Sequence, residues 1–282
     1  SIRFIYRDVW FVIIISFRNY MKISEKFVDL LQNIIINDKN IGKFYNQSFI
    51  HTKYSLKLIL NEIFYILRNG ISWREIRSPI KWQTLYSHFN RFTKFGIFHI
   101  FYSYVRNLFI NSNNCQLQII DSTFIMNKYG KDVMHRNKFF KNKNCNKISL
   151  ITNSNGTPLS VSIDSGNLHD LSFIDKHVNE LNDFISNNNV KISLLGDKGY
   201  VSKKHKSHLS TFNYDLIYPP KKNMKNIEIF DKVVYKKRIN IEHSFSTLKS
   251  FKRIQFRFDS SFISFCSFIY LAISVMIFNK IK

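Results

Sequence analysis

The sequence predicts an all-α domain followed by an α/β domain with a mixed sheet and flanking helices. Apolar residues repeat at helical spacing from residue 24 to about residue 110. The polar stretch 111–114, Asn-Ser-Asn-Asn, then separates this region from one with short apolar runs. We therefore expect domains at residues 21–112 and 115–282, and a short N-terminal extension at residues 1–20 that carries no signal-peptide cleavage pattern.

Helix start and stop signals mark the first domain. Ser24 is a suitable N-cap for a helix that runs to about Ile36, and Gly70 can end the next helix. A later helix is expected around Trp82, and a fourth over Ile97 to Phe109. The second of these helices has an apolar face made by Leu56, Ile59, Leu60, Ile63, Phe64 and Leu67, and the third has one made by Leu85, Tyr86, Phe89 and Phe92.

Short helices with tight turns and many cations favour a helix-turn-helix-like DNA-binding domain. A plain helical bundle is the alternative. Trp73 and Trp82 do not decide between the two, because both are better interpreted as core residues.

The second domain alternates strands with helices, which predicts one α/β layer. A hairpin turn is expected around 153–156, after the basic, Asn-rich loop 128–146, and a helix at Leu171 to Ile185. Asp231 can cap the last amphipathic helix. The expected strands are Gln116–Ile120, Lys147–Thr152, Pro158–Asp164, Lys191–Leu195 and Tyr214–Tyr218.

The charge of the chain points to a polyanionic partner. The net charge is +23, from 42 Lys and Arg against 19 Asp and Glu. Such an excess attracts nucleic acid. An A+T-rich genome, which enriches Lys, Asn, Ile and Phe together, explains part of the excess. The 28 Phe and the aromatic content of 16% indicate a folded protein rather than a disordered basic tail.

Cysteines and apolar runs restrict the compartment. Cys115, Cys145 and Cys266 are far apart and form no Cys-x-x-Cys pair, so neither a zinc site nor a disulfide framework is indicated. We expect a reducing, cytoplasmic compartment, with the protein on nucleoid DNA if the host is bacterial. The seventeen residues Phe262–Phe278 carry no charge but are interrupted by serines. A buried helix is therefore favoured over a membrane span.

Four residues near the C-terminal end form one helical stripe. Tyr235, Arg238, Glu242 and Lys249 lie at offsets 0, 3, 7 and 14, which places them within about 60° on a helical wheel. The opposite side of the same helix is apolar. It carries Val233, Val234, Ile241, Leu248 and Phe251. One acid among cationic and phenolic groups is suited to a phosphate backbone.

Two further acids, Asp121 and Asp197, directly follow short apolar strands. The ends of strands are where α/β folds expose functional groups. Together with Glu242 these carboxylates would repel one another unless cations neutralise them, and Mg²⁺ prefers such oxygen ligands. Two ions about 4 Å apart can hold both the attacking and the leaving oxygen of a phosphoryl displacement.

The stripe resembles a known signature. Its spacing, Tyr-x2-Arg-x3-Glu-x6-Lys, is similar in every interval to the Tyr-Arg-Glu-Lys signature of DDE transposases from bacterial insertion sequences. Other motifs follow the order of that family. They are Gly70-x-x-Trp73-Arg74, Trp82-x-Thr84-x-Tyr86-x-x-Phe89, Asp121-Ser-Thr, Asn155-Gly-x-Pro158, Gly166-Asn-x-His169-Asp170 and Asp197-Lys-Gly-Tyr200.

The resemblance covers about residues 55–280 and is greatest to the insertion-sequence-five-like group. Phe92 stands where these proteins often have Trp, and Gly196 where Ala is usual. Neither departure touches the acids. The resemblance implies an RNase H-like catalytic domain in which Asp121, Asp197 and Glu242 are catalytic and bind Mg²⁺ or Mn²⁺, with two ions expected.

The resemblance also implies the reaction. Water cleaves the phosphodiester at the transposon end and leaves a 3′-hydroxyl, which then attacks a target-DNA phosphate. The partners implied are double-stranded DNA, with terminal inverted repeats and a target, and a second copy of the chain in a dimer. A catalytically inactive or domesticated DNA-binding relative and a nuclease without strand transfer remain alternatives.

The cations around the acids are expected to bind DNA. Lys249 lies about 10 Å along the helix from Glu242, so with Tyr235 and Arg238 it is assigned to phosphates beside the scissile bond. Residues 221–257 hold eleven Lys or Arg against three acids. From this run and the Asp197 motif, the expected DNA contacts also include Lys198, Lys252 and Arg253. No catalytic role is expected for His169, Asp170 or His243, and Asn155-Gly156 is interpreted as a hairpin turn only.

Overall fold

The computed structural model describes residues 24–39, 41–45, 53–113, 115–132, 135–138, 141–188, 191–219 and 231–281. The expected extension at residues 1–20 lies outside them. The chain divides into two compact units between Ile97 and Phe98, not at the polar stretch 111–114. From Phe98 on, the helix α6 (Ile97–Ser112) is therefore part of the second unit. Arg106 pairs with Glu180 at 2.6 Å.

The first unit is helical, as predicted. Ser24 Oγ accepts a hydrogen bond from the Phe27 amide at 3.2 Å, and Gly70 ends a helix with φ 66°. Both expected caps are therefore confirmed. The elements are α2 (Glu25–Asn37), α3 (Gly42–Tyr45), α4 (Leu56–Asn69), η2 (Trp73–Glu75) and α5 (Trp82–Lys94).

The expected apolar faces form the core of this unit. All six residues predicted on α4 are buried, and so are Leu85, Phe89 and Phe92 on α5. Tyr86 is the exception, because 39% of it is exposed. The Trp73 ring lies 5.2 Å from the rings of both Tyr86 and Phe89, but Trp73 and Trp82 are only partly buried and are not the core residues that were expected.

The second unit is built on a mixed sheet. β1 lies between β3 and β5, β6 follows β5 at one edge, and both β2 and β4 pair with β3. The β1–β3 and β3–β4 pairs are antiparallel, whereas β1–β5 and β5–β6 are parallel. This is the RNase H-like arrangement that the resemblance implied. The strands are β1 (Leu117–Met126), β2 (Arg136–Asn137), β3 (Lys143–Asn153), β4 (Pro158–Ser165), β5 (Ile192–Leu195) and β6 (Tyr214–Ile217).

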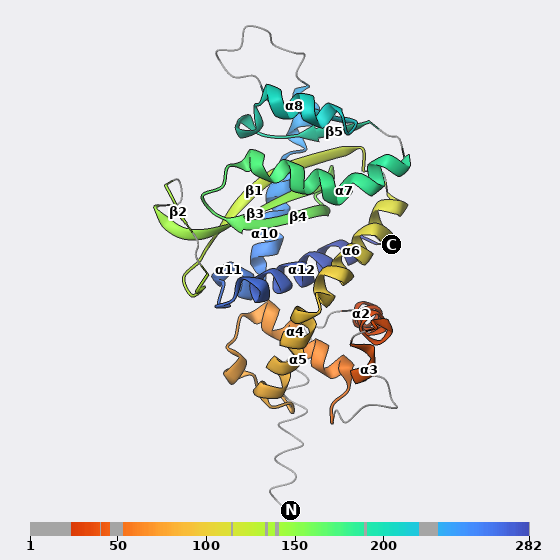
Figure 1. Ribbon diagram of the computed structural model, residues 1–282, viewed down its shortest axis with the longest axis vertical. Helices are drawn as coiled ribbons and strands as arrows, with labels where there is room; N and C mark the ends of the chain where they lie inside the picture. The colour runs from red at the N-terminus through yellow and green to blue at the C-terminus, as the bar shows by residue number, and fades with distance from the viewer. Residues whose placement is uncertain are drawn as a thin grey trace, which may run out of the picture. The chain divides into compact units, whose positions relative to one another are not determined.

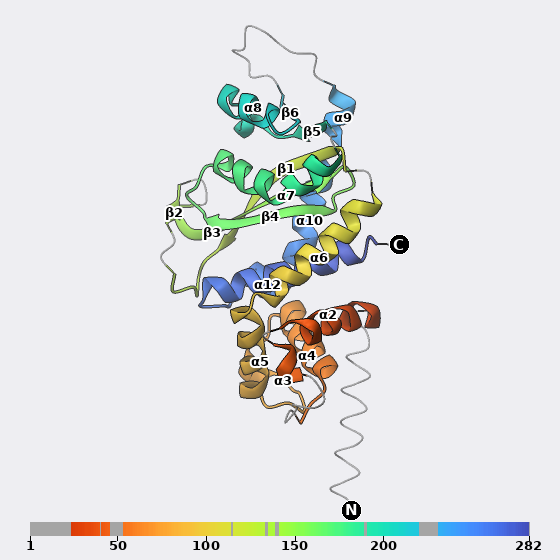
Figure 2. The same ribbon diagram turned by 45° about the vertical axis from the view of Figure 1, so that its right-hand side comes forward.

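Helices cover both faces of this sheet. α7 lies against one face and α10 crosses the other (Figures 1 and 2). α12 is largely buried, as predicted, and the ring of its Tyr270 lies 4.8 Å from that of His99 on α6. The helices after the hairpin are η3 (Asp170–Phe173), α7 (Ile174–Asn188), η4 (Lys198–Tyr200), α8 (Lys203–Ser210), α9 (Lys232–Lys236), α10 (Ile239–Ser250), α11 (Lys252–Phe256) and α12 (Phe262–Phe278).

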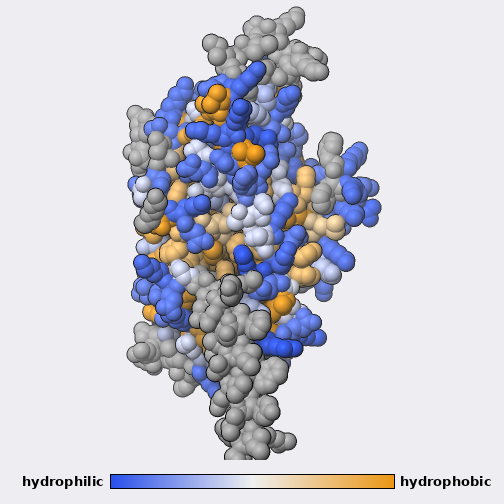
Figure 3. Space-filling view, turned by 180° about the vertical axis from the view of Figure 1, so that it is seen from behind, coloured by the Kyte–Doolittle hydropathy of each residue, from blue (hydrophilic) through white to orange (hydrophobic). Residues whose placement is uncertain are grey.

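The surface agrees with the composition. Figure 3 shows hydrophilic side chains over much of one face, with a band of paler and hydrophobic residues across its middle. Among the described residues, no helix combines the length and the apolar character that crossing a membrane requires.

Two elements differ from the prediction. β1 continues for six residues beyond Ile120, because β3 keeps pairing with it as far as Met126. The loop predicted at 128–146 accordingly contains β2 and the start of β3. The single helix expected after Asp231 is broken into α9 and α10, with Arg238 between them.

Candidate active site

Strand register brings Asp121 and Asp197 together. The last paired residues of the parallel strands β1 and β5 are Ile119 and Leu195. Each aspartate follows its paired residue by two positions, and parallel strands rise equally per residue. The two acids therefore lie close enough for the charge of Asp197 to raise the pKa of Asp121. The predicted location of Asp121 after a strand is wrong, since β1 continues, but β1 has lost its parallel neighbour at that point.

A tight turn fixes Asp197 from the other side. The Gly199 amide donates to Asp197 Oδ1 at 2.7 Å, so this aspartate caps η4. Tyr200 at the end of η4 is buried beneath the acids. Burial raises the pKa of the Tyr200 hydroxyl, and the negative charges of Asp170, Asp121 and Asp197 raise it further.

The break between α9 and α10 decides what faces the acids. Asp231 caps α9, as predicted, by accepting from the amides of Val233 and Val234 at 2.7 and 3.1 Å. The chain then turns at Lys237 and Arg238. Because α9 takes its own direction, Val233 is 74% exposed rather than in the core. On α10 and just after it, the predicted apolar side chains Ile241, Leu248 and Phe251 are buried.

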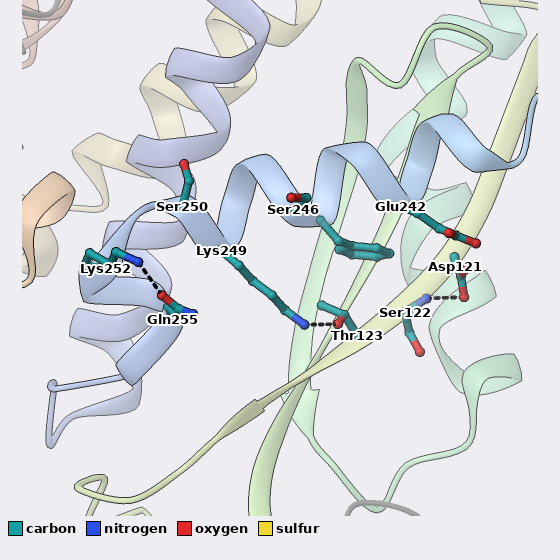
Figure 4. Close-up of a pocket in the computed structure, with 10 residues that line it drawn as sticks. Asp121, Ser122, Thr123, Glu242, Ser246, Lys249, Ser250, Lys252 and Gln255 are labelled. Atoms are coloured by element: carbon teal, nitrogen blue, oxygen red, sulfur yellow. Dashed lines mark hydrogen bonds between the residues drawn. The ribbon is translucent and has the colours of Figure 1, made fainter.

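A pocket of about 650 Å³ separates β1 from α10. Figure 4 shows Glu242 reaching from α10 toward Asp121 on β1. About two turns further along α10, Lys249 Nζ donates to Thr123 Oγ1 at 2.6 Å. Burial lowers the pKa of Lys249. Among the lining residues are Asp121, Ser122, Thr123, Glu242, Ser246, Lys249, Lys252 and Gln255.

Arg238 is the counter-ion of this pocket. Its Nη2 lies 2.5 Å from Asp121 Oδ2, and its Nη1 lies 3.8 Å from Glu242 Oε1. Burial raises the pKa of Asp121, and the guanidinium of Arg238 opposes that shift, while the charge of Asp197 adds to it. No ready-made group of three metal-binding side chains is present in the part of the chain that the structure describes.

The hairpin turn between β3 and β4 holds α10 in place. Asn240 Nδ2 donates to the Ser154 carbonyl at 2.7 Å, and Ser244 Oγ donates to the Gly156 carbonyl at 2.5 Å. Gly156 has φ 80°, and a Cβ there would lie 2.6 Å from the Asn240 carbonyl oxygen. The Asn155-Gly156 motif is thus more than a turn, because only glycine leaves room for the helix that carries Glu242.

A fourth acid stands beside the site. Asp170, for which no catalytic role was expected, accepts from Ser122 Oγ at 2.5 Å. It also pairs with Lys147 Nζ at 3.2 Å, and Lys147 itself is buried. A lysine in a buried position of β3 was the sequence signal that could have revealed this pair, since lysine is almost never buried without a partner.

The expected DNA contacts have different surroundings. Lys252 and Lys198 are exposed, on the pocket wall and directly after Asp197. Tyr235 is partly buried, and burial raises the pKa of its hydroxyl. Arg253 corrects the prediction. It is 4% exposed and pairs with Asp259 through Nη2 at 2.7 Å and through Nε at 3.0 Å, so its guanidinium does not face solvent.

Comparison with known proteins places this site in a family. The family model described as "Transposase DDE domain" matches residues 111–261, more than half of the 282 residues. A second model, "Putative transposase of IS4/5 family", matches residues 46–101. No curated protein sequence matches this chain.

Solved structures show only a distant likeness. The Mos1 mariner paired end complex with Mn has 9% identity, with 94% of each chain covered and a TM-score of 0.30. The Mos1 Strand Transfer Complex has 9% identity, with 79% of this chain and 76% of that chain covered and a TM-score of 0.28. The first of the two family models covers more than half of the chain, so the chain belongs to the DDE transposases.

Proposed function

We propose that this transposase cuts and joins DNA at the ends of an insertion sequence, with Asp121, Asp197 and Glu242 as its metal-binding catalytic acids. The proposal is supported by the parallel pairing of β1 and β5, the strands that lead to Asp121 and Asp197, and by the pocket shared by Asp121 and Glu242. Three carboxylates from two strands and a helix supply different parts of one reaction.

The donor set fits a divalent metal. Carboxylate oxygens are the ligands that Mg²⁺ and Mn²⁺ prefer, and three carboxylates suffice for two ions that share substrate oxygens. When bound, such ions activate the attacking hydroxyl and stabilise the leaving oxygen. Arg238 now neutralises Asp121 at 2.5 Å, so we infer that its guanidinium leaves this carboxylate when a divalent cation takes it.

The cations of the site then have a second task. Once released from Asp121, Arg238 can donate two hydrogen bonds to a DNA phosphate. Lys249, which donates to Thr123 Oγ1 at 2.6 Å, and exposed Lys252 line the pocket, and exposed Lys198 directly follows Asp197. Tyr235 is assigned to a flanking phosphate. These groups position the scissile phosphodiester, whose cleavage by water yields a 3′-hydroxyl and a 5′-phosphate.

The remaining assignments follow from this reaction. We propose that the helical first unit binds the terminal inverted repeats, a role separate from catalysis. Joining needs two ends held together, so we propose a homodimer on DNA. The compartment is wherever the target DNA lies, the cytoplasm in a bacterial host.

Cleavage and joining by the full chain test the proposal. DNA that carries the matching terminal repeats is incubated with Mg²⁺ or Mn²⁺. Asp121→Asn, Asp197→Asn and Glu242→Gln are each expected to lower cleavage more than about 100-fold, since they remove metal ligands. DNA binding without metal should persist. The matched control is Asp215→Asn, an acid on β6 outside the pocket, which should cleave normally.

Each contrary result has a definite meaning. Unchanged cleavage in all three acid variants would refute the site. Wild-type protein that binds the repeats without metal-dependent cutting would support the inactive, DNA-binding alternative. Cut products without joined strands would identify a nuclease.

A further inference from the structure

The chain reverses its usual polarity around Arg257. Arg257 is completely buried, whereas its neighbours Phe256 and Phe258 are 49% and 38% exposed. Charged side chains normally lie outside and large apolar ones inside. Burying the cation and exposing two rings therefore calls for a functional reason.

The reversal is firmly built. Arg257 Nη2 pairs with Asp132 at 2.9 Å, and Nη1 donates to the Asn146 side chain. The guanidinium also lies 5.0 Å from the Phe265 ring centre. The backbone of Arg257 is left-handed, with φ 41°, which few non-glycine residues adopt. This turn directs the two flanking rings outward.

The exposed rings form a continuous row. The centre of the Phe258 ring lies 5.6 Å from that of Phe256 and 5.7 Å from that of Tyr129, which is 46% exposed. A lysine stands at each end of the row. Lys252 Nζ lies 6.0 Å from the Phe256 ring centre, and Lys128 Nζ lies 5.2 Å from the Tyr129 ring centre. We call Phe256, Phe258 and Tyr129 the aromatic row.

The aromatic row begins where the catalytic pocket ends. Lys252 and Gln255 on α11 line the pocket together with Asp121 and Glu242, and Phe256 is the next residue after Gln255. A strand that leaves the pocket along α11 meets these rings first. Because the rings are flat and the flanking lysines are cationic, they match the two parts of a nucleotide, its base and its phosphate.

We propose that the aromatic row is a stacking site for unpaired DNA bases beside the scissile phosphate. The proposal rests on the proposed function, since it needs DNA in the pocket. A second copy of the chain is the less suitable occupant, because the lysines at both ends would meet those of an equally cationic partner of net charge +23. Paired bases do not expose their faces, so the row distinguishes unpaired DNA from duplex.

A binding experiment without metal tests this proposal separately from catalysis. The full chain is titrated with two terminal-repeat duplexes, one fully paired and one with unpaired bases at the flank. The double variant Phe256→Leu/Phe258→Leu keeps apolar volume but removes the flat faces. We expect it to weaken binding to the unpaired flank about tenfold, as loss of base stacking does, and to leave duplex binding within about twofold.

Matched variants and outcomes complete the design. In contrast to the double variant, Phe258→Trp should keep the wild-type binding to the unpaired flank, since the tryptophan ring can also stack on a base. Tyr104→Leu, an equally exposed aromatic residue on α6 at 44%, should change nothing. Equal losses for both DNAs in a double variant that melts normally would overturn the proposal. Dissociation of a dimer by the same variant, measured by sedimentation, would overturn it by assigning the row to a second copy. The acid variants should lose cleavage but keep the wild-type ratio of affinities for the unpaired-flank and the fully paired DNA, so the two proposals are tested separately.

Discussion

Two arginine–aspartate pairs in the second unit have the same chemistry and opposite surroundings. Arg238 pairs with Asp121 at 2.5 Å on the pocket wall, with side chains 22% and 18% exposed. Arg257 pairs with Asp132 at 2.9 Å, and its side chain is 0% exposed. Arg238 has a second acid, Glu242, 3.8 Å away, whereas Arg257 has the Asn146 amide and an aromatic ring around it.

The difference separates an exchangeable pair from a permanent one. The Arg238 side chain is already partly exposed to water, so another cation can replace it at Asp121 at moderate cost. Arg257 has no such exposure, and an unpaired guanidinium in its place would keep most of its desolvation cost. The first pair therefore suits a site that changes partners, and the second suits a fixed support for the aromatic row.

Removing the acid from the permanent pair is expected to have the largest effect on stability. Asp132→Asn should lower the free energy of unfolding by about 3 kcal/mol, since it leaves Arg257 buried without its charge partner. Asp121→Asn should cost much less, because Arg238 can rehydrate. Urea unfolding of both variants measures the contrast. Equal losses would contradict it, and Arg257→Met combined with Asp132→Asn should recover most of the loss.

The contact between Gly156 and α10 allows a test of whether the pair of Arg238 and Asp121 depends on a fixed position of α10. Gly156→Ala should lower the free energy of unfolding by about 2 kcal/mol, because its Cβ would lie 2.6 Å from the Asn240 carbonyl oxygen at a positive φ. Gly96→Ala is the matched control, since Gly96 also has a positive φ, 66°, but no atom within 4 Å of an added Cβ. Cleavage should fall in the first variant only. Similar losses in both would mean that backbone strain alone is responsible.

A pH series isolates a group outside both pairs. Burial lowers the pKa of His177 from 6.5 to about 3, where its ring bonds Ser149 and Ser160 at 2.9 and 2.6 Å. Below pH 6.5 His177 is protonated in the unfolded chain but stays neutral in the folded protein until about pH 3. The free energy of unfolding should thus decrease by about 1.4 kcal/mol for each unit by which the pH is lowered below 6.5, because of this histidine. Unfolding in urea at pH 7.5, 6 and 5 measures the slope.

The control for this series keeps the hydrogen bonds. His177→Gln should reduce the slope by about one proton. His88, whose pKa burial lowers to about 4, leaves a residual slope in the same direction. An unaltered slope in His177→Gln would contradict the assignment.

Local signals made much of the fold predictable. Ser24, Gly70 and Asp231 act at the helix ends that they marked, because a cap depends on residues within one turn. The mixed sheet followed from the order of strands and helices. The length of β1 did not, since β3 rather than the sequence around Asp121 prolongs that strand.

The features of the site that the sequence did not predict depend on contacts between residues that are far apart in the chain. Lys252 and Arg253 are neighbours in one cationic run. Arg253 is buried in an ion pair with Asp259, whereas Lys252 is exposed. The break before α10 and the closing of Arg238 onto Asp121, 117 positions away in the chain, likewise depend on packing. Spacing therefore identified the candidate acids but not the counter-ion between them.

The matched register of Asp121 and Asp197 has a consequence for how this gene can change. One residue inserted within β1 or β5 would turn the following carboxylate to the other face of the sheet and move it by about 3.3 Å. Both strands must therefore keep their lengths up to the acids. Insertions and deletions among relatives should therefore be missing directly before either aspartate.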